Sequence, residues 1–342
     1  MRAAIYNPYL DTLGGGERYT MAFSQVLVKK GFRVDVEWKN KGIKKKLEDR
    51  FGMNLKDGNI VKNINRGNGY DLCFWVSDGS IPLLYARKNF LHFQFPFKGV
   101  SGKSLLNRMK FFRIEKTICN SYFTKRFIDE EYGIESVVIY PPVDVNKIKP
   151  RTKENLIVSI GRFSQLGQAK RQDFLVKEFK KLYDSGFRDW KLVLAGGVEV
   201  GVDDYVDKLK KASRGYPIKV VESPSLKEIK GLYGRAKIFW SATGFGVDEN
   251  KEPKRVEHFG ITTVESMAAG CVPLVFSAGG HKEIVVDGES GFLWRRSGDL
   301  LNKTKKIIDD KKLLRALSLK AREDSKIYEI DRFDAEVGKV IA

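Results

Sequence analysis

Two carboxylates lie eight residues apart in the segment Glu257–Glu265, which has the sequence EHFGITTVE. Gly260 between them lets the chain turn into a helix, whose first backbone N–H groups have no partner within the helix. Because such amides bind phosphate, we expect a diphosphate at this turn, held by the amides of Ile261–Thr263. Glu265 then accepts hydrogen bonds from ribose hydroxyls, and Glu257 reaches a sugar hydroxyl. The alternative is a capped helix with a glutamate at each end, which fits less well with the small residues that follow in SMAAGCVP.

The loop Gly161–Phe174, GRFSQLGQAKRQDF, follows an apolar strand and holds two cations that suit a diphosphate. Arg162 offers a planar fork of donors, and Lys170 offers a mobile point charge. A helix begins after them, near Gln172. Taken alone, the two cations are better explained by a solvated basic loop than by a diphosphate site.

Two further strand ends carry residues that can do chemistry. Gly14, Gly15 and Gly16 precede a helix, where glycines let the backbone approach a phosphate, although a tight strand-to-helix turn explains them equally well. Their spacing is not GxGxxG, so the dinucleotide fingerprint is absent. His92 lies in NFLHFQFP, where an imidazole can bind a sugar hydroxyl or a developing charge. The alternative is a structural histidine, and a position at the expected ligand cleft favours the functional role.

Short apolar strands alternate with amphipathic helices around these loops, which predicts parallel sheets with helices on both faces. The number of such units fits two Rossmann-like domains better than one. We expect one domain over residues 1–148 and another over 153–324, joined by the proline-rich stretch Pro141–Thr152. Ligands of two such domains bind in the cleft between the carboxyl ends of their strands. The predicted strands are 3–6, 33–37, 72–76, 89–93, 116–120, 136–139, 156–160, 191–195, 218–221, 238–241 and 272–276.

The chain of 342 residues is basic, with a formal net charge of +19. Such an excess attracts nucleic acid, an acidic lipid surface or a phosphorylated substrate, and charge does not choose among them. A nucleic-acid-binding protein is the least favoured of these, because the sequence has no recognisable nucleic-acid motif. No apolar run approaches the roughly 18–20 residues that span a bilayer. The N-terminal residues predict a strand and no signal peptide, and three distant cysteines form no disulfide framework, so we expect a cytoplasmic protein.

Metal chemistry is not indicated by the sequence. No group of histidine, cysteine and carboxylate residues has the spacing of a metal site, and no Asp-x-Asp motif follows a strand. We therefore expect no bound metal. The sequence also lacks the elbow of a serine nucleophile.

The stretch 98–116, KGVSGKSLLNRMKFFRIEK, combines six basic residues and one acidic residue with several large apolar ones. A basic amphipathic helix of this kind can lie on an anionic membrane, which would indicate a lipid-linked or lipid acceptor. Alternatively, the helix packs its apolar side on its own domain. The sequence does not choose between the two.

With these residues in view, the chain resembles the family 4 glycosyltransferases, which have the GT-B fold of two Rossmann-like domains facing each other across a cleft. The glutamate pair of Glu257–Glu265 matches the signature of that family, and the motifs GGGER, YPPVD and GRF, with Lys170 after them, fall in the family's order. Together with HFQFP and EHFGI, they look closest to the branch of the lipid-linked-oligosaccharide α-1,2-mannosyltransferase. The resemblance covers nearly the whole chain.

The resemblance implies a retaining, metal-independent transfer of mannose or glucose from a nucleotide diphosphate sugar to a glycan or lipid-linked acceptor. The donor would be of the GDP-mannose or UDP-glucose type, and no other cofactor would be needed. The second domain would hold the donor and the first the acceptor, with a C-terminal helix at about 325–342 returning to the first domain. The alternative acceptor is a soluble sugar or metabolite. A lipid-linked acceptor would place the protein peripherally on the inner face of the membrane.

The resemblance also assigns roles to the matched positions. The two catalytic candidates are His92, which would contact the sugar near the reacting carbon, and Glu257, which would hold the donor sugar. Fixed positive charge and helix amides would stabilise the leaving diphosphate. The donor-binding candidates are Gly15, Gly16, Arg162, Lys170, Phe259, Gly260, Ile261, Thr262 and Glu265.

Overall fold

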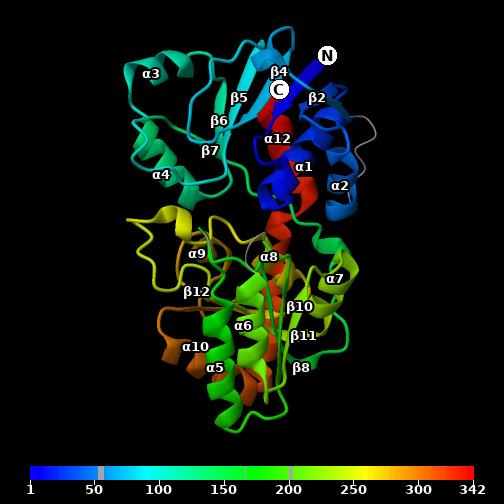
Figure 1. Ribbon diagram of the computed structural model, residues 1–342, viewed down its shortest axis with the longest axis vertical. Coiled ribbons are helices and arrows are strands. Elements are labelled where there is room, and N and C mark those ends of the chain that lie inside the picture. The colour runs from blue at the N-terminus through cyan, green and yellow to red at the C-terminus, as the bar shows by residue number, and fades with distance from the viewer. Residues whose placement is uncertain (53–57, 166, 200–202) are drawn as a thin grey trace. The chain divides into compact units, whose positions relative to one another are not determined.

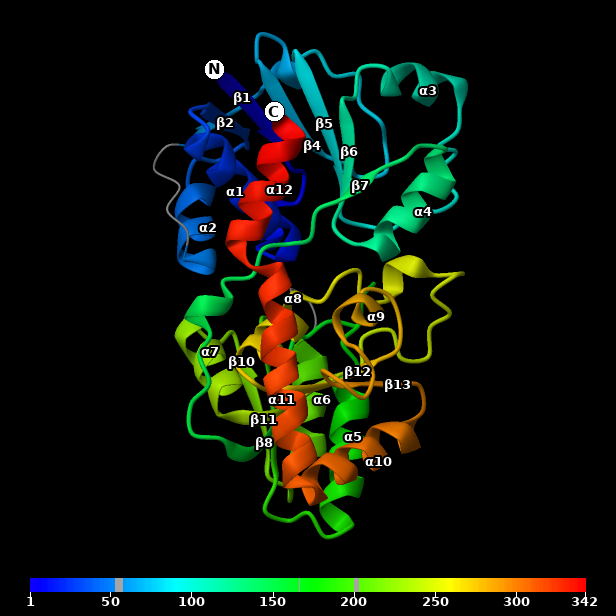
Figure 2. The same ribbon diagram turned by 180° about the vertical axis from the view of Figure 1, so that it is seen from behind.

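The computed structural model describes residues 1–52, 58–165, 167–199 and 203–342, so Leu166 in the predicted phosphate loop lies outside the described residues. The chain divides into two compact units, one of Met1–Pro142 with Ile330–Ala342 and the other of Val143–Glu329. Each unit is built on a parallel sheet with helices packed against it (Figure 1, Figure 2). Two parallel α/β sheets are the architecture that the sequence predicted, and the fold class is confirmed.

The first unit contains a seven-stranded parallel sheet in the order β3-β2-β1-β4-β5-β6-β7. The strands are β1 (Arg2–Tyr6), β2 (Arg33–Glu37), β3 (Gly58–Val61), β4 (Leu72–Val76), β5 (Lys88–Phe93), β6 (Lys116–Cys119) and β7 (Val137–Val138). The α-helices are α1 (Gly15–Lys29), α2 (Ile43–Phe51), α3 (Leu105–Phe111), α4 (Tyr122–Tyr132) and α12 (Ile330–Ile341). The strand order reverses between β1 and β4, which is the position where open sheets of this kind bind ligands.

Successive side chains of the first sheet enter two separate cores, because strand residues alternate between the faces of a sheet. Phe90 of β5 packs with Tyr19 of α1 and Phe333 of α12. Leu91, the next residue, packs on the other face with Ile128 of α4. The two faces of this sheet are therefore covered by different helices.

Helix α12 belongs to the first unit and lies beside α1 (Figure 1, Figure 2). Phe333, Val337 and Ile341 recur every four residues, which gives the helix one apolar face, and all three are buried. Lys29 of α1 forms an ion pair with Asp334 at the edge of this contact. The spacing of the apolar residues thus accounts for the return of the C-terminus to the first sheet.

The second unit contains a six-stranded parallel sheet in the order β10-β9-β8-β11-β12-β13, which reverses between β8 and β11. The strands are β8 (Glu154–Ile160), β9 (Lys191–Gly196), β10 (Ile218–Glu222), β11 (Ala236–Ser241), β12 (Val272–Phe276) and β13 (Phe292–Trp294). The α-helices are α5 (Gln172–Asp184), α6 (Asp203–Ser213), α7 (Leu226–Arg235), α8 (Ile261–Ala268), α9 (His281–Ile284), α10 (Ser297–Asp309) and α11 (Lys311–Ser325). Its core joins strand residues such as Ile157 and Trp240 with Phe179 of α5.

The sequence interpretation missed several short elements, among them α2, β3 and β13. The two strands lie at the edges of their sheets and hold four and three residues, too few to show an alternating pattern. Helix α2 has the sequence IKKKLEDRF, in which only Ile43 and Leu47 are buried. Short edge elements are specified by the neighbours they pair with, and a sequence pattern does not carry that information.

Candidate functional site

The loops after β8 and β11 lie at the position where the second sheet reverses its order, because these two parallel strands are neighbours. The loop after β8 leads to Lys170, and the longer segment after β11 leads to Glu257. These are two of the segments in which the sequence predicted donor binding. The topology therefore gathers residues from distant parts of the chain at one edge of one sheet.

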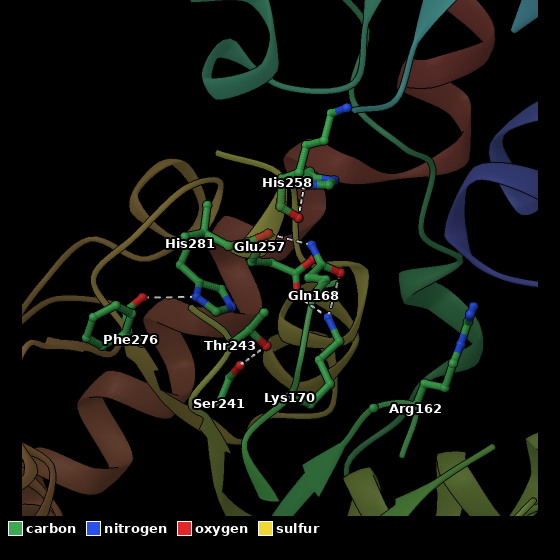
Figure 3. A network of polar contacts seen from close by, with 12 residues as sticks. Arg162, Gln168, Lys170, Ser241, Thr243, Glu257, His258, Phe276 and His281 are labelled. Atoms are coloured by element: carbon green, nitrogen blue, oxygen red, sulfur yellow. Dashed lines mark hydrogen bonds and ion pairs between the residues drawn. The ribbon is translucent and has the colours of Figure 1, made fainter. Parts of the chain in front are cut away.

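An ion pair joins the two loops. Lys170 Nζ lies 2.8 Å from Glu257 Oε2 and donates to Gln168 Oε1 at 2.9 Å. Gln168 Nε2 in turn donates to the carbonyl oxygen of Val256 at 2.6 Å. Figure 3 shows these side chains converging on one another. The Lys170 side chain is 20% exposed and that of Glu257 14%, so the pair is largely withdrawn from water.

The ion pair determines the charge state of Glu257. Burial alone would raise the pKa of this carboxyl, but the Lys170 ammonium, together with the His281 and His258 imidazoles, lowers the pKa to about 2. Burial lowers the pKa of the His258 and His281 imidazoles to about 4. At neutral pH, Glu257 is therefore ionised and both histidines are neutral.

Each of these histidines is fixed by a backbone carbonyl. His258 Nε2 lies 3.1 Å from the oxygen of Lys254, and His281 Nδ1 lies 3.0 Å from the oxygen of Phe276. A neutral imidazole can approach a carbonyl oxygen in this way only by donating from that nitrogen. The contacts thus set the tautomer of both rings, and the His258 contact also holds the chain on either side of Glu257.

Glycines allow a second loop to approach the backbone of Glu257. Gly280 N donates to the Glu257 carbonyl oxygen at 2.8 Å, and a Cβ on Gly279 would lie 2.0 Å from the same oxygen. Gly279 also has a φ of +57°, which glycine adopts without strain. Glu249 accepts a hydrogen bond from Gly279 N at 2.7 Å. The Gly279-Gly280 pair is therefore needed for this loop to pack against the backbone of Glu257.

Helix α8 starts after Gly260, whose φ of +117° lies in the left-handed region. Thr263 N donates to the Gly260 carbonyl oxygen at 2.9 Å, so the expectation that the Thr263 amide is free was wrong. The amides of Ile261 and Thr262 come before the first hydrogen bonds of the helix and can receive an anion. The ring of Phe259 packs edge-on against Tyr328, with ring centroids 5.3 Å apart. Phe259 thus anchors the start of the helix through its ring, and its predicted role in donor binding stays a prediction.

Glu265 lies one turn into α8 and is buried. The hydroxyl of Tyr233, from α7, donates to Glu265 Oε2 at 3.2 Å. This contact orients the carboxylate from a neighbouring helix. The predicted role as a ribose ligand stays a prediction.

The structure does not bring Arg162 to the ion pair. Its side chain points away from Lys170 in Figure 3 and lies 3.7 Å from Glu199, with 41% of its surface exposed. The start of the loop is held by the backbone, since Phe163 N donates to the Gly197 carbonyl oxygen at 2.8 Å. Of the two predicted phosphate-binding cations, only Lys170 stands beside Glu257.

Three polar residues at this site were not predicted from the sequence. Gln168 bridges Lys170 to the neighbouring loop, and Ser241 and Thr243 share a buried hydrogen bond of 3.2 Å at the end of β11 (Figure 3). Two hydroxyl residues directly after the apolar run IFW were a usable signal, because polar groups at a strand end face the ligand edge of the sheet. No sequence pattern marked Gln168.

The predicted glycines of the first unit open α1. Gly14 is its N-cap residue, and Gly15 and Gly16 are its first two helical residues. The Glu17 carboxylate folds back to accept hydrogen bonds from Gly14 N and Thr12 Oγ1, both at 2.7 Å. This helix start therefore already holds a negative charge of its own.

His92 is placed inside the core of the first unit. Its ring stacks on Tyr19 with centroids 4.2 Å apart and lies 5.5 Å from the ring of Phe74. No part of the residue is exposed, and burial lowers the pKa of the imidazole to about 3. This position does not support the predicted contact with a sugar, because α1 covers the ring. The structural role that the sequence left open fits the observed packing.

The stretch 98–116 contains α3, and α3 buries none of its residues. Phe112 is 90% exposed, Leu105 75%, Leu106 62% and Met109 60%. The alternative in which the helix packs its apolar side on its own domain is therefore wrong. Only Phe111 and the following Ile114 contact the core of the unit.

The described residues lack two features that mark other classes of protein. No group of three or more histidine, cysteine or carboxylate side chains in this part of the chain could hold a metal ion. Among the helices of the described ranges, none has the length and apolar character needed to cross a bilayer.

The sequence of the second unit matches an established family. The model of the glycosyl transferases group 1 matches residues 142–324, which is more than half of the chain. The protein belongs to this family. It is a group 1 glycosyltransferase, and the segments around Lys170 and Glu257 lie inside the matched region.

Several known proteins are similar to this glycosyltransferase. An uncharacterized glycosyltransferase of Methanocaldococcus jannaschii is 26% identical over 294 residues, 82% of this chain and 78% of that protein. The GDP-Man:Man(3)GlcNAc(2)-PP-Dol α-1,2-mannosyltransferase of Dictyostelium discoideum is 32% identical over 180 residues, 48% of this chain and 34% of that protein. The GDP-mannose:cellobiosyl-diphosphopolyprenol α-mannosyltransferase of Komagataeibacter xylinus is 26% identical over 144 residues, which cover 42% of this chain and 33% of that protein. The match spans about a third of the length of each mannosyltransferase.

Solved structures share the fold of this glycosyltransferase at low sequence identity. Anabaena HepE in complex with UDP aligns over 100% of this chain and 99% of its own, with a TM-score of 0.79 and 17% identity. Sucrose-phosphate synthase of Thermosynechococcus elongatus aligns over 100% of this chain and 98% of its own, with a TM-score of 0.73 and 15% identity. These likenesses confirm the GT-B fold that the sequence resemblance implied.

The ion pair predicts a pH-dependent stability of the glycosyltransferase. The pKa of Glu257 is about 2 in the folded chain against an ordinary value of 4.5, so its contribution is complete above about pH 4.5 and disappears as the pH falls towards 2. A shift of this size corresponds to a free energy on the order of 3 kcal/mol. We expect Glu257→Gln to lower the free energy of unfolding at pH 7, with the difference from wild type shrinking between about pH 4.5 and 2. Urea unfolding at several pH values measures this.

Glu252→Gln is the matched control, because Glu252 pairs with Arg255 in the same segment but is half exposed. This variant should change stability by less than about 1 kcal/mol at any pH. A Glu257→Gln effect of equal size at pH 7 and pH 3 would contradict the assigned charge state.

Proposed function

We propose that this glycosyltransferase transfers a hexose, most favourably mannose, with retention of configuration, from a nucleotide diphosphate sugar to a lipid-linked glycan. The observation that carries the proposal is the buried Lys170–Glu257 pair beside the start of α8 in the second unit. A cation, an ionised carboxylate and free helix amides are the groups needed to bind a diphosphate and an adjoining sugar.

Lys170 is suited to the phosphate role by its remaining donor. An ammonium group has three N–H bonds, and two of them are used by Glu257 and Gln168. The third can donate to a phosphate oxygen while the two protein contacts hold the ammonium in place. Because the group is already fixed and largely shielded from water, it stabilises the charge that develops on the leaving diphosphate with little rearrangement.

Glu257 and the start of α8 supply the other contacts. The ionised Glu257 is an acceptor only, so it suits a hydroxyl group of the donor sugar. The amides of Ile261 and Thr262 receive phosphate oxygens, and Glu265, oriented by Tyr233, accepts from the ribose. In this proposal Glu257 binds the sugar and does not act as a nucleophile.

The relatives favour GDP-mannose as donor and a diphosphate-linked lipid glycan as acceptor. The names of the Dictyostelium and Komagataeibacter enzymes both state a GDP-mannose donor and a lipid diphosphate acceptor. UDP-glucose is the second donor to test, and a soluble sugar is the second acceptor.

A donor screen tests the proposal. We expect the wild-type protein to bind GDP-mannose more tightly than UDP-glucose or ADP-glucose in calorimetric titrations. Lys170→Met should weaken binding of the preferred donor by about tenfold to a hundredfold, because it removes a charge-assisted contact to the phosphates. Lys177→Met, at an exposed position on α5, is the control and should bind as wild type does. Equal binding by the Lys170→Met and wild-type proteins would contradict the phosphate role.

Metal independence has its own test. The proposed phosphate contacts are a lysine and backbone amides, which need no divalent cation. We expect sugar transfer to proceed at the same rate with excess EDTA as with added Mg²⁺. The rate is measured from the nucleoside diphosphate that the reaction releases. Loss of activity in EDTA that Mg²⁺ restores would contradict this part of the proposal.

We further propose that α3 rests on an anionic membrane that carries the acceptor. At about 100° per residue, Leu105, Leu106, Met109 and Phe112 fall within one stripe of the helix surface, and Phe111 points to the opposite side. Arg108 and Lys110 lie on the two flanks of this stripe. An apolar stripe with flanking cations is the arrangement of helices that lie in the membrane interface, where long basic side chains reach the headgroups.

The loop before α3 is held in place by the rest of the unit. The Glu131 carboxylate accepts hydrogen bonds from the amides of Gly99, Val100 and Gly102, at 2.8, 2.9 and 3.2 Å. The stripe is thus held by contacts within its own unit, although most of its apolar surface is exposed. Charge favours a lipid surface as the occupant, because the stretch 98–116 has six basic residues and one acidic residue.

Vesicle sedimentation tests the membrane surface. We expect the protein to bind vesicles that contain phosphatidylglycerol and not vesicles of phosphatidylcholine alone, with binding reduced at high salt. Replacing Leu106 and Phe112 with serine should reduce binding at least tenfold, since each loses a large buried apolar area on the membrane. Leu319→Ser, at an exposed apolar position on α11, is the control. Vesicle binding that survives the double replacement would contradict the assignment to α3.

A further inference from the structure

We infer that a cavity between the loop before α3 and the end of α4 binds a phosphate ester that carries a primary ammonium group, and that phosphatidylethanolamine of the membrane supplies it. The cavity lies in the first unit and has a volume of about 320 Å³. Sites for small molecules span roughly 300–1,000 Å³, so this cavity suits a lipid headgroup and not a whole lipid or glycan. The inference deepens the proposed membrane surface and rests on it for the source of the ligand.

The two walls of the cavity carry opposite charges. One wall is the loop before α3, which contributes Lys98 and Lys103. The other wall is the end of α4, which contributes Glu130 and Glu131. Phe127 lies one turn before these glutamates and adds an apolar ring to the helix wall. A ligand in this cavity therefore meets cations on one side and carboxylates on the other.

Close packing of the loop on α4 holds the two walls in place. A Cβ placed on Gly102 would lie 2.6 Å from the carbonyl oxygen of Glu131 and 2.7 Å from Cδ1 of Tyr132, so only glycine lets the loop approach the helix this closely. A Cβ placed on Gly133 would lie 3.4 Å from Cε of Lys103, so the stem of this lysine runs along the end of α4. The cavity is therefore formed before any ligand arrives.

The two carboxylates of the helix wall differ in what they already bind. Glu131 accepts from three amides of the loop, as described above. Burial would raise the pKa of Glu131, but these amides and the nearby Lys103 lower it. Glu130 and Lys103, in contrast, form no hydrogen bond or ion pair with any residue of the described ranges. Glu131 thus serves the loop, whereas Glu130 and Lys103 are available to a ligand.

Opposite charges that line one cavity without pairing select a ligand with both charges. The Lys103 ammonium suits a phosphate oxygen, and Glu130, which only accepts, suits an N–H donor. A purely anionic headgroup would place a negative charge beside Glu130. A choline headgroup would bring a positive charge but no N–H to donate. Phosphoethanolamine joins a phosphate to a primary ammonium through two carbons, so it can bind both walls at once.

The position of the cavity favours a membrane lipid over a reacting substrate. The loop that lines it leads directly into α3, and Phe111 of α3 packs on Tyr132 at the end of α4, with ring centroids 6.0 Å apart. Helix α4 begins just after the carboxyl end of β6, and a rise of about 1.5 Å per residue puts Glu130 roughly 12 Å along the helix from this start. Reacting ligands of such sheets bind at the carboxyl ends of the strands. A headgroup in this cavity would therefore attach the enzyme to the membrane and take no part in the transfer.

The first experiment compares two kinds of vesicle that contain the same fraction of phosphatidylglycerol. The remaining lipid is phosphatidylethanolamine in one and phosphatidylcholine in the other, so the surface potential is equal. We expect the wild-type protein to bind the vesicles with phosphatidylethanolamine about fivefold to tenfold more tightly, because only this headgroup donates to Glu130. Sedimentation measures the difference. Equal binding to both kinds of vesicle would overturn the lipid as the source of the ligand.

Glu130→Gln tests whether the cavity is responsible for this preference. Glu130 is exposed, so the variant should keep the wild-type melting temperature and should bind the phosphatidylcholine vesicles at least as tightly as wild type does. We expect its preference for phosphatidylethanolamine to fall below about twofold. Glu135→Gln is the matched control, because Glu135 is exposed just after α4 and does not line the cavity. A preference that survives in Glu130→Gln would assign it to the packing of the bilayer and would overturn the site.

A soluble ligand tests the cavity without any membrane. We expect glycerophosphoethanolamine to shift the NMR signals of the loop amides of residues 99–103 in a saturable way, and glycerophosphocholine to shift them far less. Glu130→Gln should abolish the difference between the two esters. Equal shifts by both esters would overturn recognition of the ammonium group, and no shift by either would overturn the site. Failure of the wild-type protein to bind any vesicle that contains phosphatidylglycerol would contradict the proposed α3 surface instead.

Discussion

The Lys170–Glu257 ion pair is the interaction on which the organisation of the second unit's site depends. It joins the loop after β8 to the segment after β11, and Lys170 keeps Glu257 charged in a largely buried position. The glycines behind Glu257 and the amide of Gln168 beside Lys170 serve this pair. A charged pair that is costly to bury and precisely supported is better explained by a function than by stability alone.

The same pair shows how a site can bind an anion with a carboxylate close to it. Glu257 does not cancel the lysine, because an ammonium has three donors and the pair leaves one of them for a ligand. The free amides at the start of α8 add positive charge from the backbone. The neutral histidines contribute no charge and act through their contacts with backbone carbonyls.

The two units each contain a helix that starts at a glycine, but the surroundings of the two helix starts differ. Both sheets reverse their strand order, and in each unit a glycine at this edge precedes a helix. At the start of α8 the amides of Ile261 and Thr262 come before the first hydrogen bonds of the helix, whereas at the start of α1 the Glu17 carboxylate accepts from Gly14 N. The start of α1 therefore already meets a carboxylate of its own chain, and the start of α8 is the one that the proposed function assigns to a phosphate.

The sequence by itself determined the fold class, most of the strands and the segments that carry the chemistry. Strands such as β8 and β11 are long apolar runs, and the glutamate pair around Gly260 is a local pattern that needs no tertiary information to be recognised. Tertiary structure alone decided which of the predicted residues meet. Lys170 reached Glu257 and Arg162 did not, because the direction of a side chain in a loop depends on neighbours such as Glu199 that are distant in sequence. Burial of His92 and exposure of α3 were decided in the same way: both patterns fit two environments, and only the packing of other elements against them selects one.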